Sequence, residues 1–357
     1  MLVAMMAAVA PSVVEAQYFG RNKVQYQTFD FRVLSTQHYD IHYYPAESTA
    51  TADAARMAER WYTRLSGIMR QNFNRKPLVF YADHPDFEQT NVIGGFIDQS
   101  TGGVTEAARN RVVMPFTGIY AENDHVLGHE MVHVFQYDIA EAPTSGGFQG
   151  LGQLPLWLIE GMAEYLSVGR EDPHTAMWMR DAALRNDLPS IRKLTTDPRY
   201  FPYRYGQALW AYIGGKWGDQ GVSDVYRASL RGGWDAALRR VVGVSSDSLS
   251  KEWLASIRAT YLPLMEGRTN PWDLGHALLG TGKEPGDMNV APAISPDGKY
   301  VAFFARRGLF TVDLFVADAN TGKILRKLTG PNADPHFDAL SFVNASGSWS
   351  PDGKKLA

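Results

Sequence analysis

The sequence has 357 residues, enough for two or three domains at roughly 100–200 residues each. Hydrophobic residues make up 45% of it and charged residues 20%, which is typical of globular proteins and excludes a wholly disordered or fibrous chain. The formal net charge of −3 gives no basic excess, so no nucleic-acid partner is expected. Cysteine is absent, which excludes disulfides and thiolate metal sites and leaves His, Asp and Glu as candidate metal ligands.

The N-terminus has the pattern of an export signal. Residues 1–10 are an apolar run that Pro11 ends. The tripeptide VEA then precedes Gln17, so short residues stand three and one before the peptide bond between residues 16 and 17, as at a signal-peptidase cleavage site. The run is shorter than the about 20 residues that a membrane-spanning helix needs. We therefore expect residues 1–16 to be a signal peptide, no membrane span, and a protein that is periplasmic, on the outer surface or secreted. The alternative is a buried N-terminal strand or helix.

The chain then divides into a strand-rich part and a helical part. Strands are expected within residues 29–44, 78–82 and 110–116, a helix over 51–73, and mainly helices from 124 to about 258 with breaks near 146–152, 198–202 and 214–221. We interpret the Gly-rich stretch 146–152 as a hinge between two helices. This order predicts an α+β fold rather than alternating βαβ units.

A repeat marks the C-terminal part of the sequence. From residue 289 short strands alternate with turn dipeptides, and the segment SPDGK occurs at 295–299 and again 55 residues later at 350–354. Repeats of this length with several strands each are typical of β-propellers. Because fewer than two blades cannot close a propeller, we expect an incomplete all-β propeller segment and a longer natural protein.

The strongest chemical signal is the HExxH motif that His129, Glu130 and His133 form. On an α-helix, residues four apart lie on one face, so the two imidazoles can bind one cation while Glu130 faces a water molecule on it. Glu160 follows on a second predicted helix, 27 residues after His133, and is the candidate third ligand. Two His and one Glu leave the fourth zinc position open, as in catalytic sites. A metzincin is excluded because the positions three and six after His133 are Gln and Ile.

These residues resemble the gluzincin metallopeptidases. The HExxH motif followed by Trp157-Leu158-Ile159-Glu160-Gly161 is similar to the zinc aminopeptidase branch, in which the Glu before Gly is the third zinc ligand. The resemblance implies a thermolysin- or aminopeptidase-like catalytic domain, with a small sheet and a helical lobe, that binds one Zn²⁺ per chain. It also implies that Glu164 orients a zinc-binding histidine.

A second match covers the segment that begins at Tyr203. YRYGQALWAY is similar to the Y-x-x-G-x-A-L-x-x-Y helix start of the aminopeptidase branch, whose first Tyr stabilises the oxyanion, so the resemblance gives this role to Tyr203, with Tyr205 as the alternative. The G-x-M-E-N motif that reads a free amine is missing; the nearest text is GGVTEA at 102–107. We therefore predict an endopeptidase. The strand at 111–115 is a candidate edge for an extended peptide.

The parts N- and C-terminal to the motifs resemble exported bacterial proteins that join a gluzincin-type domain to TolB-like propeller blades. The predicted organisation is a signal peptide over 1–16, a zinc metallopeptidase domain over 17–275 and the start of a TolB-like propeller over 286–357. The predicted reaction is hydrolysis of peptide bonds by a zinc-activated water, with Glu130 as general base. The alternative is a cell-envelope protein that binds or assembles protein partners through its propeller, with an inactive or structural metal domain.

Overall fold

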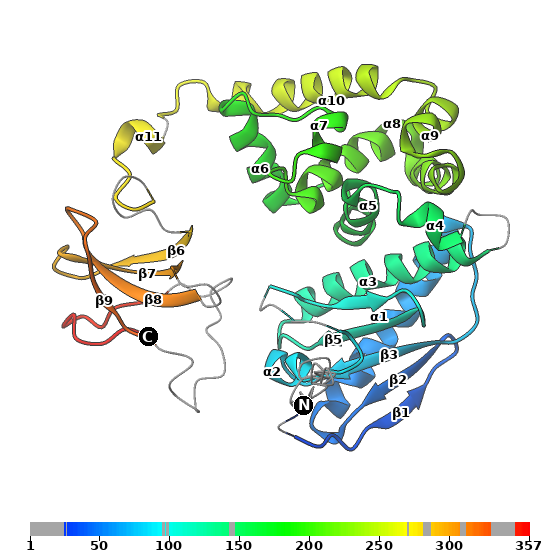
Figure 1. Cartoon of the computed structure of the whole chain (residues 1–357), viewed down its shortest axis with the longest axis horizontal. Coiled ribbons are helices and arrows are strands. Elements are labelled where there is room, and N and C mark those ends of the chain that lie inside the picture. Colours follow the sequence, from blue (N-terminus) through cyan, green and yellow to red (C-terminus); the bar gives the residue numbers. More distant parts are fainter. Residues whose placement is uncertain are drawn as a thin grey trace, which may run out of the picture.

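The computed structural model describes residues 25, 27–94, 97, 100–142, 147–269, 271–280, 287–307, 312–329 and 347–357. The predicted signal peptide, residues 1–16, lies outside these ranges. Within them, no helix combines the length and hydropathy that a membrane crossing requires. The chain forms a first lobe around a five-stranded sheet, a lobe of helices, and a second, four-stranded sheet (Figure 1).

The first sheet has the strand order β1-β2-β3-β5-β4. Its strands are β1 (Arg32–Ser35), β2 (Tyr39–Tyr43), β3 (Lys76–Tyr81), β4 (Val104–Glu106) and β5 (Arg111–Pro115). The β2–β3 and β3–β5 pairs are parallel, whereas β1 and β4 are antiparallel to their neighbours. The sequence analysis missed β4, and its suggestion that 111–115 forms an edge is wrong, because β5 pairs on one side with β3 and on the other with β4.

Two long helices, α1 (Ser48–Met69) and α3 (Tyr120–Glu141), cover one face of this sheet (Figure 1). The crossover β2-α1-β3 is a βαβ unit, which the sequence pattern did not predict. Helix α1 buries Ala58, Trp61 and Leu65 at helical spacing against the sheet and α3. The close approach of α1 to α3 depends on Gly128, because a Cβ there would lie 2.5 Å from the Trp61 ring. Helix α3 is therefore fixed between the sheet and the helical lobe.

The remaining helices form the second lobe. They are α4 (Gly147–Leu151), α5 (Leu156–Val168), α6 (Pro173–Leu184), α7 (Ile191–Thr196), α8 (Pro202–Gly232), α9 (Trp234–Val241) and α10 (Ser246–Tyr261). The shorter helical pieces elsewhere in the chain are α2 (His84–Glu88), α11 (Pro271–Leu274) and the 3₁₀ turns Pro45–Glu47 and Pro263–Met265. The predicted break near 214–221 is a kink inside α8 at Gly218, whose φ of 77° lies in the left-handed region. The described part of the Gly-rich stretch is a short helix, α4, rather than an open hinge.

Helices α5 and α8 cross at a pair of glycines. A Cβ on Gly161 would overlap the backbone of Gly206, and a Cβ on Gly206 would lie 2.6 Å from the carbonyl oxygen of Trp157. Two backbones can approach this closely only where neither residue carries a side chain. The crossing therefore fixes the residues on either side of Gly161 in α5 against the first turn of α8.

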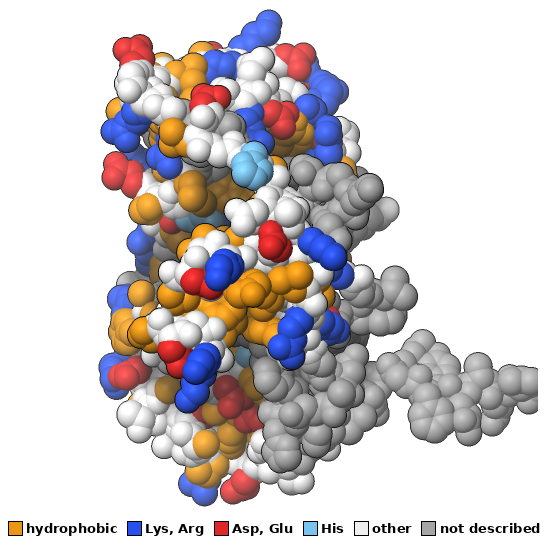
Figure 2. All heavy atoms as spheres, turned by 90° about the vertical axis from the view of Figure 1, so that its left-hand side faces the viewer, with side chains coloured by type: hydrophobic (Ala, Val, Ile, Leu, Met, Phe, Trp, Pro, Cys, Tyr) orange, Lys and Arg blue, Asp and Glu red, His pale blue; other side chains and the backbone are white. Residues whose placement is uncertain are grey.

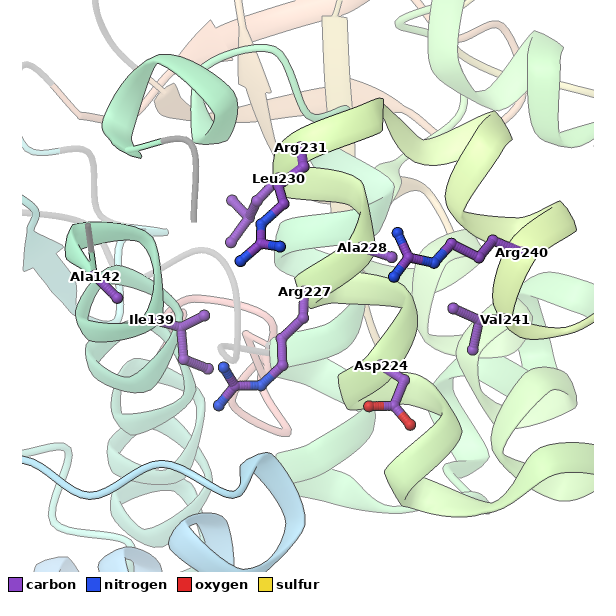
Figure 3. Close-up of a pocket in the computed structure, with 9 residues that line it drawn as sticks. All are labelled: Ile139, Ala142, Asp224, Arg227, Ala228, Leu230, Arg231, Arg240 and Val241. Atoms are coloured by element: carbon purple, nitrogen blue, oxygen red, sulfur yellow. The ribbon is translucent and has the colours of Figure 1, made fainter. Parts of the chain in front are cut away.

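A pocket of about 450 Å³ lies between the end of α3, α8 and α9 (Figure 3). Arg227 on its wall donates hydrogen bonds to the carbonyl oxygens of Met69 and Arg70 at the C-terminus of α1. Asp224 pairs with Arg70. Arg227 thus satisfies the last carbonyl group of α1 and that of the residue after it, and together with the Asp224–Arg70 pair it joins the sheet lobe to α8.

The second sheet has the order β6-β7-β8-β9, with all pairs antiparallel. Its strands are β6 (Asp287–Ile294), β7 (Tyr300–Arg306), β8 (Val312–Asp318) and β9 (Ile324–Lys327). Both SPDGK segments form the same turn: the Ser hydroxyl donates to the Asp carboxylate at 2.7 Å in the first copy and 2.6 Å in the second. Trp349, just before the second copy, donates to the carbonyl oxygen of Ala293. The repeat in sequence is thus a repeat in local structure.

The second sheet carries several exposed apolar side chains. Ile294 is 66% exposed, and Tyr300, Leu325 and Leu328 are also exposed. Figure 2 views the molecule from the side on which this sheet lies in Figure 1, and hydrophobic side chains gather near the middle of that face. Exposed apolar side chains are normal on protein surfaces, so this feature alone identifies no interface.

The α5–α8 crossing gives a direct test of the packing. Gly206→Ala should lower the free energy of unfolding by about 1–3 kcal/mol, because the added methyl group overpacks the crossing. Gly215→Ala on the same helix is the matched control, since a Cβ there meets no atom within 4 Å. It should be neutral or raise the free energy of unfolding by up to about 1 kcal/mol through helix propensity. Equal effects of the two changes in urea unfolding would contradict the crossing.

Candidate metal centre

Helix α3 carries the HExxH residues at its middle, where the helix lies between the sheet and α5. His129, Glu130 and His133 are 8%, 5% and 5% exposed. The spacing of four residues brings the two imidazole rings to a centroid distance of 4.9 Å on the side facing α5. Buried imidazoles need polar partners, and each of these finds them on α5 or α3.

Glu160 on α5 completes a compact set of three atoms that could bind a metal ion, called the donor atoms below. Its Oε2 atom lies 3.2 Å from His129 Nε2 and 3.1 Å from His133 Nε2, and the two Nε2 atoms are 3.2 Å apart. Ligand atoms of one tetrahedral zinc ion, each at 2.0–2.1 Å, are separated by roughly 3.4 Å. The three atoms thus have nearly the mutual spacing of one face of such a site, and the donor set of two nitrogens and one carboxylate suits this ion. The sequence placed these three residues together, and so does the structure.

The charges in this set shift one another's pKa values. Burial would lower the pKa of His129, but its hydrogen bonds with Glu160 and Glu164 outweigh burial and raise it to about 10. Burial would raise the pKa of Glu160, yet the charge of His133 and hydrogen bonds from both histidines hold it well below its usual range. Without an ion, the site therefore keeps an ionised carboxylate beside protonated imidazole.

The Nδ1 atom of each histidine has a fixed acceptor. His133 Nδ1 donates to Gln136 Oε1 at 2.8 Å, and Gln136 in turn donates to the carbonyl oxygen of Ile159 next to Glu160. An amide oxygen and a carboxylate can only accept, so Nδ1 carries the proton and Nε2 is left for an ion. The sequence analysis used Gln136 only to exclude a metzincin and did not recognise this role.

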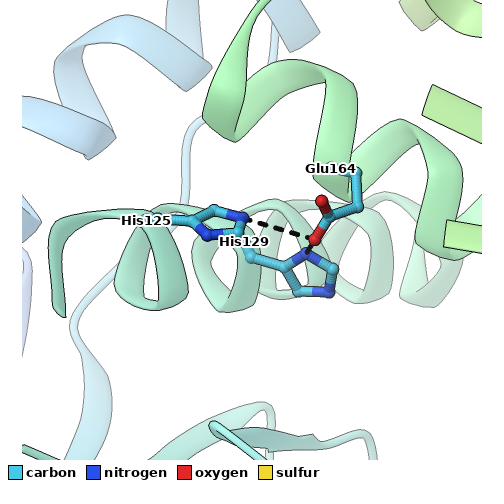
Figure 4. Close-up of side chains that lie close together, drawn as sticks. All are labelled: His125, His129 and Glu164. Carbon is cyan, nitrogen blue, oxygen red and sulfur yellow. Dashed lines mark ion pairs between the residues drawn. The ribbon is translucent and has the colours of Figure 1, made fainter. Parts of the chain in front are cut away.

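Glu164 is the acceptor for the other histidine and the centre of a wider network (Figure 4). His129 Nδ1 lies 3.0 Å from Glu164 Oε1, and His125 Nε2 lies 3.3 Å from the same oxygen. Arg204 lies 3.0 Å from Oε2 and also pairs with Asp172 at 3.2 Å. The predicted contact between Glu164 and a site histidine is therefore present. His125 and Arg204 are partners that the sequence analysis missed, since charge alone predicts no contact over such separations.

His125, His129 and Glu164 also lie close enough to hold a metal ion as a second group. Two observations disfavour this role. His129 Nδ1 would have to give up its proton while Nε2 serves the first group, and the Arg204 guanidinium already neutralises Glu164. We interpret this group as a hydrogen-bond network that orients His129.

Glu130 is held by the edge strand β4. The Thr105 hydroxyl donates to Glu130 Oε2 at 2.6 Å and contacts the carbonyl oxygen of the same residue at 3.1 Å. A Cβ on Gly103 would lie 3.1 Å from Glu130 Oε1, so the chain passes close to this carboxylate. The sequence analysis inspected 102–107 only for an amine-binding motif and did not find the contact, which depends on the β4 strand it missed.

The two candidate tyrosines lie in different places. The Tyr203 ring stacks on His129 at a centroid distance of 5.8 Å. Burial, the negative charge of Glu160 and a hydrogen bond to Glu160 together raise the pKa of Tyr203. Tyr205 instead packs against Trp178 and Tyr200, away from the donor set. The structure thus brings Tyr203 to the site, and not Tyr205.

Metal binding should compete with protons at this site. Zn²⁺ that binds His129 Nε2 has to displace the proton that the pKa of about 10 implies. Because the pKa of His133 is raised as well, we expect at least one proton to be released per Zn²⁺ at pH 7, and the affinity to fall at least about tenfold for each unit of pH from 8 to 6. Calorimetric titration of chelator-treated protein in buffers of different ionisation enthalpy measures both quantities.

The controls for this titration come from the same chain. Glu160→Gln should weaken Zn²⁺ binding strongly because it removes the negatively charged metal ligand. His174→Ala, which changes an exposed histidine on α6, should leave the Zn²⁺ affinity unchanged. An affinity independent of pH, or equal binding by the Glu160 variant, would contradict the assignment of these donor atoms.

Comparison with known proteins supports a peptidase in this part of the chain. Residues 100–188 match a protein-family model described as BSP, peptidase of plants and bacteria. A search of the curated proteins found no match to the chain. The matched range runs from before β4 to the residues after α6, so it includes Thr105, the HExxH residues, Glu160 and Glu164. Residues 100–188 are therefore similar to a peptidase domain, in agreement with the sequence prediction at that level.

Proposed function

We propose that this chain is a zinc-dependent metallopeptidase that cuts within peptide chains. The observation that carries the proposal is the triangle of His129 Nε2, His133 Nε2 and Glu160 Oε2, with edges of 3.1–3.2 Å. It lies within the range that matches a peptidase family. Three protein donors leave one position for water or substrate, as catalytic zinc sites require.

Zinc bound there would polarise the scissile carbonyl group and lower the pKa of water. Glu160 supplies an ionised carboxylate because its pKa is held low, and Glu164 and Gln136 keep the histidines in the required orientation. Arg204 offsets the charge of Glu164, so the buried site does not carry excess negative charge.

Glu130 is the general base in this proposal. It takes a proton from the attacking water and delivers it to the leaving amine. Thr105 binds one of its carboxylate oxygens, which restricts the side chain to one orientation. Tyr203 keeps its proton at neutral pH, because its pKa is raised. In this proposal its hydroxyl exchanges its hydrogen bond to Glu160 for one to the developing oxyanion.

The preference for internal bonds is supported by what surrounds β4. Among the described residues β4 pairs only with β5, so its other edge is available to an extended peptide next to Glu130. Reading a free N-terminal amine requires an available carboxylate. Glu106, the acidic residue beside Thr105, already pairs with Arg111.

We also propose that the domain has a gluzincin fold and that the second sheet begins a TolB-like propeller in an exported protein. The donor atoms on α3 and α5 support the gluzincin fold. The identical SPDGK turns support the TolB-like propeller. A protein partner of the second sheet is the alternative function. A pull-down that requires this sheet but tolerates Glu130→Gln would favour it.

Glu130→Gln should abolish cleavage while Zn²⁺ stays bound. General-base catalysis typically contributes 10²–10⁴-fold, so a loss of at least about 10²-fold is expected. The measurement is mass-spectrometric profiling of cuts in a mixed peptide library, with zinc content determined in parallel. Glu141→Gln, at the exposed end of the same helix, is the matched control.

Each other outcome of this experiment has a defined meaning. Loss of zinc in Glu130→Gln would make Glu130 a structural residue. Trimming only from free N-termini would contradict the endopeptidase proposal. No cuts by the wild type with one zinc bound would contradict peptidase activity and favour the binding function.

Tyr203→Phe should lower kcat by roughly 10²–10³-fold with little change in KM, because the hydroxyl acts on charge that develops in the transition state. Tyr205→Phe is the matched control and should keep full activity, since that ring packs against Trp178. Steady-state kinetics on one internally cleaved peptide distinguishes the two. An equal loss in both variants would indicate a packing role for Tyr203.

A further inference from the structure

Three acidic side chains gather where the chain passes from β2 into α1. Glu47 ends the 3₁₀ turn before α1, Asp83 is the residue before α2, and Asp86 lies within α2. Glu47 and Asp86 are only 4% and 6% exposed. None of the three belongs to the candidate metal centre, and Glu47 and Asp86 are buried with no cation paired to either among the described residues.

Tyr44, the residue after β2, joins the two buried carboxyl groups. Its backbone N–H donates to Glu47 Oε1 at 3.0 Å, and its hydroxyl donates to Asp86 Oδ2. The same hydroxyl accepts from the backbone N–H of Ala82 at 2.7 Å, just after β3. A hydroxyl has a single proton to donate, so Tyr44 satisfies Asp86 and has none left for Glu47. The turn before α1 is thus tied to α2 and to the end of β3 through one tyrosine.

The second carboxyl oxygen of Glu47 has no partner. Glu47 Oε2 is buried and makes no hydrogen bond within the described chain. The free N–H groups in the first turn of α1 therefore do not bind this oxygen, although α1 begins at the next residue. An ionised carboxylate at this place is costly, because one of its oxygens is neither solvated nor paired.

A proton on Glu47 removes this cost. Burial and the charges of Asp86 and Asp83 outweigh the hydrogen bond from Tyr44 and raise the pKa of Glu47 to about 7. Burial and the charge of Asp83 also raise the pKa of Asp86. The positive end of the α1 dipole opposes these effects, but such dipoles shift a protonation equilibrium only about two- to fivefold. A metal ion is the other way to neutralise the cluster, yet within the described chain Glu47 and Asp86 belong to no group with metal-site spacing.

The other groups that face the cluster do not neutralise it. Tyr81 contributes from β3, and burial and the charges of Glu47 and Asp86 raise its pKa, so its phenol stays neutral. Arg111 also acts on Tyr81, but its guanidinium pairs with Glu106. The first turn of α1 adds no acidic residue. The protonation of Glu47 thus decides the charge buried beside α1.

We propose that Glu47, Tyr44 and Asp86 form a proton-operated latch between the start of α1 and α2. The latch is closed while Glu47 is protonated, and loss of this proton above neutral pH loosens the connection between β2 and α1. The folded chain disfavours the ionised form, so the stabilisation is complete below the ordinary pKa of 4.5 and is lost as the pH rises through about 7. The latch shares no residue with the metal centre and is independent of the proposed peptidase activity.

The test is hydrogen exchange of the full chain at pH 5 and pH 8, measured by mass spectrometry and corrected for the intrinsic pH dependence of exchange. Amide protection in residues 48–55, the first two turns of α1, should fall roughly 10- to 70-fold over this range, the upper value following from pKa values of 4.5 and about 7. In Glu47→Gln, which keeps the shape of the protonated side chain, the fall should be at least about fivefold smaller. Glu266→Gln, at an exposed carboxyl group, is the matched control and should behave as the wild type.

A second measurement keeps the proposal testable if Glu47→Gln folds poorly. In ¹³C spectra of the wild type, the Glu47 carboxyl resonance should titrate with a midpoint near pH 7. A midpoint below about pH 5.5, within the ordinary range of glutamates, would overturn the proposal. Equal falls in protection in the wild type and Glu47→Gln, or no fall in the wild type, would do so as well. Millimolar Ca²⁺ should not restore protection at pH 8; restored protection would make the cluster a cation site instead of a latch.

Discussion

The contact between Gly161 and Gly206 is the constraint on which the site depends. Gly161 directly follows Glu160 in α5, and Gly206 lies one turn after Tyr203 in α8. Because neither glycine has a side chain, the two helices approach until their backbones touch, and this fixes Glu160 relative to Tyr203. The two motif segments that the sequence offered separately, WLIEG and YRYG, are therefore the two halves of one helix crossing.

A second constraint is electrostatic. The site buries carboxylates from α5 beside imidazoles from α3, and each charge has a partner of opposite sign or a hydrogen bond. Glu164 shows how this is arranged: His129 and His125 approach from α3 and Arg204 from α8. Removing one partner of a buried ion pair lowers the free energy of unfolding by far more than the intact pair contributes to it, because the other charge is left buried without a partner. The network thus stabilises the assembly of three helices at the point where His129 must be oriented.

The sequence was sufficient for those parts of the site that have a fixed spacing. His129, Glu130 and His133 follow from helical geometry, and Glu160 follows from the WLIEG segment. Contacts that depend on the fold could not be predicted: Thr105 reaches Glu130 from β4, and Arg204 reaches Glu164 from α8. The βαβ unit was missed because periodicity does not show which strands pair in parallel, and the break in α8 was predicted too wide because Gly218 alone makes the kink.

The most direct test of the account is X-ray diffraction from crystals grown with Zn²⁺, recorded above and below the zinc absorption edge. The account predicts one strong anomalous peak about 2.0–2.1 Å from His129 Nε2 and His133 Nε2 and at bonding distance from a Glu160 carboxylate oxygen. A peak at His125 and Glu164 instead, or none between α3 and α5, would contradict the assignment of the metal centre and the mechanism built on it.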